Sequence, residues 1–181
     1  YLAIDLLSQA EHDEMASSIM ITTCEEVALK TSDEVENYLK TLSREKIART
    51  SIENRGAIIV ASSMTEAIEL MNEIAPEHLE IMTKNAFELL PYIKHAGAIF
   101  LGENTPEPIG DYLAGPNHTL PTGSTAKFYS PLNVEKKKKK SSIINFSKNA
   151  INELGEACAL LADTEGLTAH AKAVRVRLEN K

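Results

Sequence analysis

Residues 57–75, with the sequence AIIVASSMTEAIELMNEIA, contain the pattern that decides the fold class. The run from Ala57 to Ala61 is short and apolar throughout, which is typical of a strand buried on both faces of a parallel sheet. Residues 65–75 then place apolar side chains at helical spacing, which predicts an amphipathic helix directly after the strand. A strand followed at once by a helix is the repeating unit of α/β folds.

Two more apolar runs, residues 18–23 (SIMITT) and residues 98–101 (AIFL), predict further strands separated by helices. We therefore expect an α/β fold with an incomplete Rossmann-like parallel sheet flanked by helices, and a mainly helical C-terminal tail. Besides residues 65–75, the predicted helices are residues 2–15, residues 32–42 with Ser32 as the N-cap, residues 44–53, residues 77–82 after Pro76, residues 85–94, and residues 149–179 with a break at Gly166.

The tail has no strand of its own to pack on, so we expect it to dock against another body or another subunit. The sequence divides into an α/β half-domain over residues 1–130, which carries most site residues, and a helical tail over residues 131–181, which contacts a dimer partner. The run Lys136–Lys140 follows their junction. We interpret it as a solvated linker; the alternative is a patch for anions or nucleic acid, which five lysines without interleaved aromatic residues support weakly.

The composition limits the function classes. With 26 acidic and 19 basic residues the net charge is -7, which argues against a general nucleic-acid binder. No stretch approaches the roughly 20 apolar residues of a membrane span, and the N-terminus lacks the pattern of a secretory signal. The chain does not start with Met, so it looks like a piece of something longer. Cys24 and Cys158 lie far apart, as expected for reduced thiols in a cytoplasmic protein.

Residues 105–123, TPEPIGDYLAGPNHTLPTG, hold four of the seven prolines. Because proline lacks a backbone donor, we expect a long loop here with no helix or inner strand. Loops of this length are uncommon unless they are functional or disordered, and apolar anchors such as Ile109 and Leu120 argue for order. The polar residues Asp111 and His118 lie within it, so we interpret the segment as an active-site loop.

Several side chains could bind a metal. Gln9 and His12 are three residues apart, on one face of the first predicted helix. With Asp111 and His170 they make a nitrogen and oxygen ligand set that suits Zn²⁺, although this spacing alone also occurs by chance.

Glu77 and His78 are adjacent proton acceptors with different intrinsic pKa values, which suits a reaction with two base steps. The alternative, which the sequence alone favours, is a helix start where Glu77 complements the dipole and His78 is exposed. His118 is a further candidate for acid–base work or substrate contact. Glu165 either directs its carboxylate to the same site or is a solvated residue at a helix end.

Four segments together resemble histidinol dehydrogenases: DLLSQAEHD (5–13), NEIAPEHLEI (72–81), GAIFLGENTPEPIGDYLAGPNHTLPTGSTAKF (97–128) and EGLTAHAKAVRVRL (165–178). The resemblance covers essentially the whole chain and indicates the C-terminal portion of the family enzyme. It implies a homodimer that oxidises L-histidinol to L-histidine through L-histidinal, the last step of histidine biosynthesis, and reduces two NAD⁺.

The resemblance also implies roles for individual residues. His78 would accept the proton in the alcohol step, and Glu77 would activate water for attack on the aldehyde. Glu165 would bind the substrate's amino group. The implied metal ligands are Gln9, His12, Asp111 and, from the partner subunit, His170. The implied substrate-binding residues are Gln9, His12, His78, Asp111, His118, Glu165 and His170.

The chain departs from the family pattern in two main ways and in one milder way. The region that contacts NAD in the family lies upstream, so no NAD-contacting residue is expected here and the piece alone is expected to be inactive. The family has apolar residues where Lys136–Lys140 stand, and a Gly pair where Gly123 and Ser124 stand. The alternative function is therefore a non-catalytic zinc-binding or dimerisation module derived from the enzyme.

Overall fold

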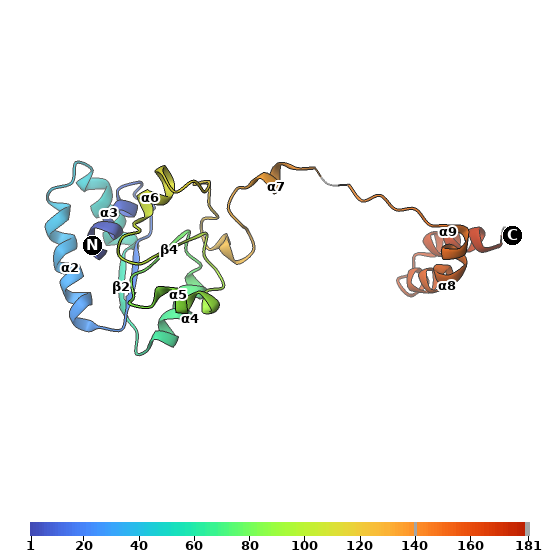
Figure 1. Ribbon diagram of the computed structural model, residues 1–181, viewed down its shortest axis with the longest axis horizontal. Coiled ribbons are helices and arrows are strands. Elements are labelled where there is room, and N and C mark those ends of the chain that lie inside the picture. Colours follow the sequence, from blue (N-terminus) through green and yellow to red (C-terminus); the bar gives the residue numbers. More distant parts are fainter. Residues whose placement is uncertain (140, 180–181) are drawn as a thin grey trace. The chain divides into compact units, whose positions relative to one another are not determined.

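A computed structural model describes residues 1–139 and 141–179 (Figure 1). The chain divides into two compact units, and the boundary along the sequence lies between Lys137 and Lys138. The expected class is confirmed: short parallel strands are flanked by helices, and the C-terminal end is helical. The first unit contains α1 (Leu2–Ala10), β1 (Ile19–Thr22), α2 (Glu25–Leu39), α3 (Glu45–Arg55), β2 (Ala57–Val60), α4 (Met64–Ile74), β3 (His78–Ile81), α5 (Ala86–Leu89), the 3₁₀ turn η1 (Leu90–Tyr92), β4 (Ala98–Leu101), α6 (Glu107–Tyr112), the 3₁₀ turn η2 (Thr125–Lys127) and α7 (Val134–Lys137).

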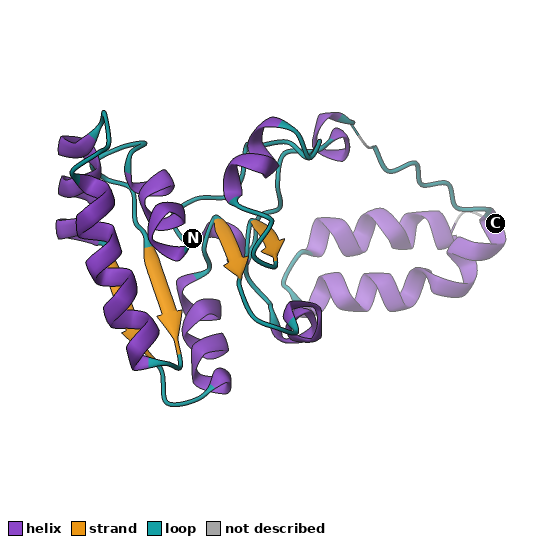
Figure 2. Ribbon diagram, turned by 60° about the vertical axis from the view of Figure 1, so that its left-hand side comes forward, coloured by secondary structure: helices purple, strands orange, loops and turns teal. Residues whose placement is uncertain are grey.

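The strands form two separate parallel sheets of two strands each (Figure 2). In one sheet, β1 pairs with β2, and Ile19 lies opposite Ala57. In the other, β3 pairs with β4, and His78 lies opposite Ala98. Parallel neighbours need a crossover, which α2 and α3 supply between β1 and β2, and α5 with η1 between β3 and β4.

The prediction of a helix over residues 77–82 is wrong, because this segment contains β3. The preceding helix α4 ends at Ala75, whose φ of 50° is left-handed and stops helix propagation. Backbone N–H groups of Gly97 and Ala98 then donate to the carbonyls of Pro76 and Glu77, which starts the parallel ladder.

The prediction that residues 105–123 contain no helix is also wrong, because α6 occupies six of them. Pro106 is its N-cap and Pro108 lies in its first turn, where the missing N–H of proline costs nothing. Two boundaries differ as well. The first helix ends at Ala10 rather than at residue 15, and α2 begins after Cys24, so Ser32 lies inside it rather than at its N-cap.

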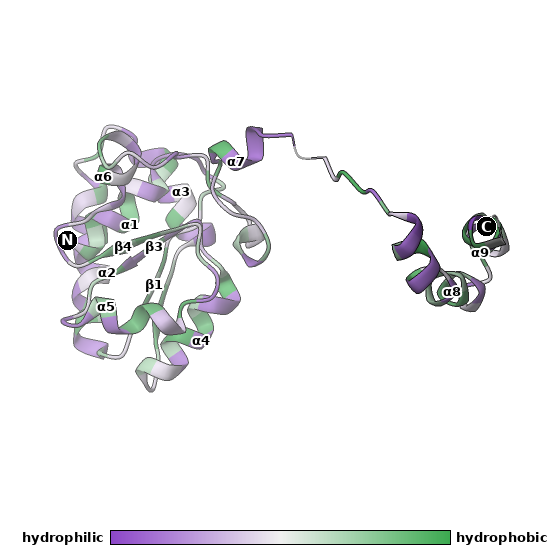
Figure 3. Cartoon of the chain, turned by 45° about the vertical axis from the view of Figure 1, so that its right-hand side comes forward, coloured by the Kyte–Doolittle hydropathy of each residue, from purple (hydrophilic) through white to green (hydrophobic). Residues whose placement is uncertain are grey.

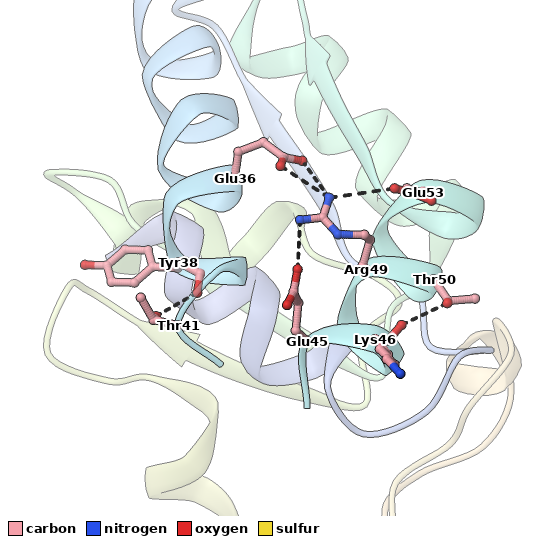
Figure 4. Close-up of polar contacts among 8 residues, drawn as sticks. All are labelled: Glu36, Tyr38, Thr41, Glu45, Lys46, Arg49, Thr50 and Glu53. Atoms are coloured by element: carbon pink, nitrogen blue, oxygen red, sulfur yellow. Dashed lines mark hydrogen bonds and ion pairs between the residues drawn. The ribbon is translucent and has the colours of Figure 1, made fainter. Parts of the chain in front are cut away.

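Helix α1 packs on α2 and α3 through a core that includes Leu7, Val35, Leu39 and Ala48. The α2–α3 pair is joined at its surface by Arg49, whose guanidinium lies 3.3 Å from carboxylate oxygens of Glu36 and Glu45 (Figure 4). Exposed ion pairs of this kind contribute little to stability, so the buried core, more than these pairs, holds α1, α2 and α3 together.

The second unit is a helical hairpin of α8 (Lys148–Thr164) and α9 (Thr168–Glu179). The expected break at Gly166 is confirmed, with a φ of 75°. Gly155 lets the helices approach closely, because a Cβ there would lie 2.9 Å from a methyl of Leu178. The lysines from Lys136 to Lys139 are exposed, the end of α7 is coloured as hydrophilic in Figure 3, and Lys140 lies outside the described residues. Within the described residues no helix is both long and apolar enough to span a membrane.

Candidate active site

Glu77 and His78 stand at the start of β3, held by the close packing of β3 on the turn before β4. A Cβ on Gly97 would lie 2.5 Å from the carbonyl oxygen of Glu77 and 3.2 Å from Cδ of Pro121. Only glycine permits that approach, so Gly97 brings the loop around Pro121 against the backbone of Glu77. His78 and Glu80 lie on one face of β3, because side chains alternate along a strand.

His78 is mostly buried, and its Nε2 has no hydrogen-bond partner among the described residues. This nitrogen lies 3.7 Å from Oε1 of Glu107, beyond hydrogen-bond distance. The ring centroid is 5.9 Å from that of Phe100. Burial lowers the pKa of His78, His12 lowers it further, and the negative charge of Asp111 opposes the shift. The imidazole is therefore kept neutral near pH 7 and can accept a proton.

Three side chains converge beside it. One ligand atom from each of His78, Glu107 and Asp111 lies within 4.8 Å of the others. Glu107 and Asp111 are four residues apart on α6, so they share a face. Burial and, next, the charge of Asp111 raise the pKa of Glu107 to about 7. The same two causes raise the pKa of Glu77.

Crowded, half-buried carboxylates next to an orphaned imidazole nitrogen fit a divalent cation. A cation there would offset the repulsion among the carboxylates. The oxygen and imidazole donors are those that Zn²⁺ accepts. The residues present thus fit the metal that the resemblance implies, and Asp111 belongs both to this cluster and to the predicted ligand set.

Two further carboxyl groups, those of Glu80 and Asp5, affect each other's pKa. Oε1 of Glu80 accepts a hydrogen bond of 2.8 Å from the backbone N–H of Glu107. Burial is the main cause that raises both pKa values, that of Glu80 to about 6.

The structure gathers five of the residues singled out from the sequence. Gln9, Glu77 and His78 line one cavity of ≈ 940 Å³ together with Glu107. His12 and Asp111 lie close enough for their charges to act on both Glu77 and His78. The alternative, a helix start where Glu77 complements the dipole and His78 is exposed, is wrong, since His78 is mostly buried and opens a strand.

The other predicted site residues are not gathered in this way. His118 is exposed, in the segment between α6 and η2. Glu165 is the C-cap of α8, and His170 lies in α9; both are exposed and belong to the second unit, so their part in the site stays a prediction.

Sequence reasoning missed Glu107, Glu80 and Asp5. The Pro-Glu-Pro string at 106–108 could have indicated a helix start with Glu107 in its first turn. Glu80 would have been found from the i, i+2 spacing to His78, had this segment been predicted as a strand. For Asp5 the only signal is its i, i+4 spacing to Gln9.

Comparison with known proteins places these residues in a family. The family model of histidinol dehydrogenase matches residues 1–178. The chain belongs to the histidinol dehydrogenase family. Curated histidinol dehydrogenases from Sulfurimonas denitrificans and Wolinella succinogenes are 69% and 64% identical to it over 178 residues. These alignments cover 98% of this chain and 41% of each relative.

A solved structure gives the same result. The crystal structure of histidinol dehydrogenase from Elizabethkingia anophelis matches with a TM-score of 0.85 and 38% identity, over 98% of this chain and 41% of that one. The chain thus spans about two fifths of the length of its histidinol dehydrogenase relatives, as expected for a portion of the family enzyme.

Proposed function

We propose that this chain is the C-terminal portion of a cytoplasmic, homodimeric histidinol dehydrogenase, which oxidises L-histidinol to L-histidine through L-histidinal. The observation that carries the proposal is the convergence of Gln9, His12 and Asp111 on Glu77 and His78 from three different elements. Membership of the histidinol dehydrogenase family supports the choice of substrate.

The proposed metal ligands are Gln9, His12 and Asp111, with His170 of the partner subunit as the fourth. A zinc ion there would hold the substrate by its imidazole and amine, and two NAD⁺ would accept the hydrides. Since no NAD-contacting residue is expected in this chain, the rest of the enzyme would supply the nicotinamide site. His118 and Glu165 are proposed to contact the substrate, Glu165 through its amino group.

The alcohol step needs a base at the hydroxyl. The neutral imidazole of His78 can take the hydroxyl proton, because its lowered pKa keeps it unprotonated. The hydride leaves from the carbon that carries this hydroxyl group. Oxidation of the alcohol carbon by two electrons then leaves the aldehyde.

The aldehyde step needs a water oxygen. Glu77 can take a proton from water as the oxygen attacks the aldehyde carbon, which yields the hydrate. Its raised pKa makes it a stronger base than an ordinary carboxylate. Loss of a second hydride and a proton from the hydrate gives the carboxylic acid. Two adjacent bases with oppositely shifted pKa values therefore match two successive oxidations.

The test uses a full-length chimera, in which this chain replaces the matching 178 residues of the Sulfurimonas denitrificans relative. We expect histidinol-dependent NADH formation by the zinc-loaded chimera and none by the 181-residue chain alone. A chimera that folds and binds zinc without turnover would favour the alternative, a non-catalytic zinc-binding or dimerisation module.

A further inference from the structure

Glu80 is the point at which two site-bearing elements meet. Its own strand, β3, carries His78 two residues earlier on the same face. Its Oε1 accepts the backbone N–H of Glu107, the first residue of α6, at 2.8 Å. One side chain therefore connects β3 and α6.

The bond to Glu107 fixes the start of α6. The first N–H groups of a helix have no partner within the helix, and the N-cap Pro106 has no side chain that could accept one. Glu80 supplies that acceptor from another element. Glu107 and Asp111 are one helical turn apart, so the bond sets the height and rotation of the face that presents both carboxylates to His78.

Asp5 lies close enough to Glu80 for each carboxyl group to affect the pKa of the other. Asp5 and Gln9 are four residues apart and share a face of α1. The helix that carries Gln9 therefore passes near the strand that carries His78, although the apolar core of α1 is formed with α2 and α3.

We propose that Glu80 is a positioning residue of the histidinol dehydrogenase site: it sets the position of α6 on β3 without touching the reacting atoms. The inference rests on the proposed function for the identity of the reaction. Its geometric content, the attachment of α6 to β3 through one hydrogen bond, stands separately and is tested separately.

The test compares two substitutions in the full-length chimera. Glu80→Gln keeps an oxygen that can accept the N–H of Glu107. Glu80→Leu has similar volume and removes that bond. Glu69→Leu is the matched control, because Glu69 is an exposed carboxylate on α4. For each variant we measure kcat, KM, zinc content per folded dimer, and amide hydrogen exchange of a peptide covering residues 105–113.

We expect Glu80→Leu to lower kcat by about 10- to 100-fold, because small displacements of catalytic groups cost that much. It should also lose zinc more readily and exchange faster over residues 105–113, while Glu80→Gln and the control match the parent. A purely structural role would lower the unfolding temperature and leave kcat, zinc content and exchange per folded dimer unchanged, and that result would overturn the proposal.

If Glu80→Leu does not fold, the decision falls to a milder pair. Glu80→Asp shortens the side chain and draws its carboxylate away from the N–H of Glu107, whereas Glu80→Gln keeps an oxygen within reach. Lower kcat in Glu80→Asp than in Glu80→Gln supports the proposal, and equal kcat values contradict it. If the parent chimera does not oxidise histidinol, the proposed function fails, and the exchange rates over residues 105–113 still decide the role of Glu80.

Discussion

Gly110 of α6 lies directly against the ring of Phe100: a Cβ at Gly110 would be 2.5 Å from Cε1 and 2.8 Å from Cζ. The ring of Phe100 in turn packs beside the imidazole of His78, with centroids 5.9 Å apart. Gly110 directly precedes Asp111. The packing of α6 on β4 therefore affects the positions of His78, a proposed base, and of Asp111, a proposed metal ligand.

We expect Gly110→Ala to lower the free energy of unfolding by about 1–3 kcal/mol, as overpacked sites do. The buried Phe100 ring cannot swing away freely, so α6 must shift and displace Asp111. The full-length chimera should also lose about 10- to 100-fold in kcat/KM. Urea unfolding and steady-state kinetics measure the two effects.

The double variant Gly110→Ala/Phe100→Leu is the control, because a smaller side chain makes room for the new methyl group. Partial recovery of kcat/KM relative to Gly110→Ala supports the steric account. A Gly110→Ala enzyme with parental kinetics would show that α6 can move without consequence for the site.

The stability of the protein should depend on the ionisation of Glu80. The pKa of this group is about 6 in the folded protein and 4.5 in a free side chain, mainly because of burial. As the pH rises from 4.5 to about 6, the unfolded chain loses this proton first, so folding becomes less favourable. Asp5 adds to the upward shift, whereas the hydrogen bond from the backbone N–H of Glu107 opposes it.

Glu80→Gln does not ionise, so its stability advantage over the parent should grow between pH 4.5 and about 6 and then stay level. Thermal unfolding midpoints of both proteins without zinc, at pH values across this range, measure the difference. Glu69→Gln serves as the exposed control. An advantage that is independent of pH, or that shrinks as the pH rises, contradicts the raised pKa.

His170 provides a test of the shared site. If the partner subunit supplies this ligand, a mixed dimer of one His12→Ala subunit and one His170→Ala subunit contains one intact site. A dimer made of two identical variant subunits contains none. We expect the isolated variants to be inactive and verified mixed dimers to approach half of the parental activity per dimer. Mixed dimers that stay inactive would place His170 outside the partner's site.

Much of the fold could be predicted from the sequence, because the apolar runs at 57–61 and 98–101 are bounded by helical patterns that local rules recognise. The strand over His78–Ile81 was missed for a physical reason. Its residues alternate over only four positions, and its conformation depends on pairing with β4, a contact about 20 residues away.

The candidate site likewise contains residues that local sequence patterns reveal and residues that only the tertiary structure reveals. Gln9 and His12 share a helical spacing, and Glu77 and His78 are adjacent, so a sequence can draw attention to them. Glu107 and Glu80 become functional candidates only when α6 is placed on β3, because their burial and their hydrogen bond are tertiary features. The residues that support a site are therefore harder to predict than those that perform its chemistry.

The most direct test of the central claim is the yield of NADH per molecule of histidinol consumed by the zinc-loaded full-length chimera at completion. Two oxidations at one site predict two NADH and L-histidine as the product. In Glu77→Gln, the aldehyde step should slow more than the alcohol step, because water activation is lost while His78 remains. No NADH, or a limit of one NADH per histidinol in the parent enzyme, would contradict the account.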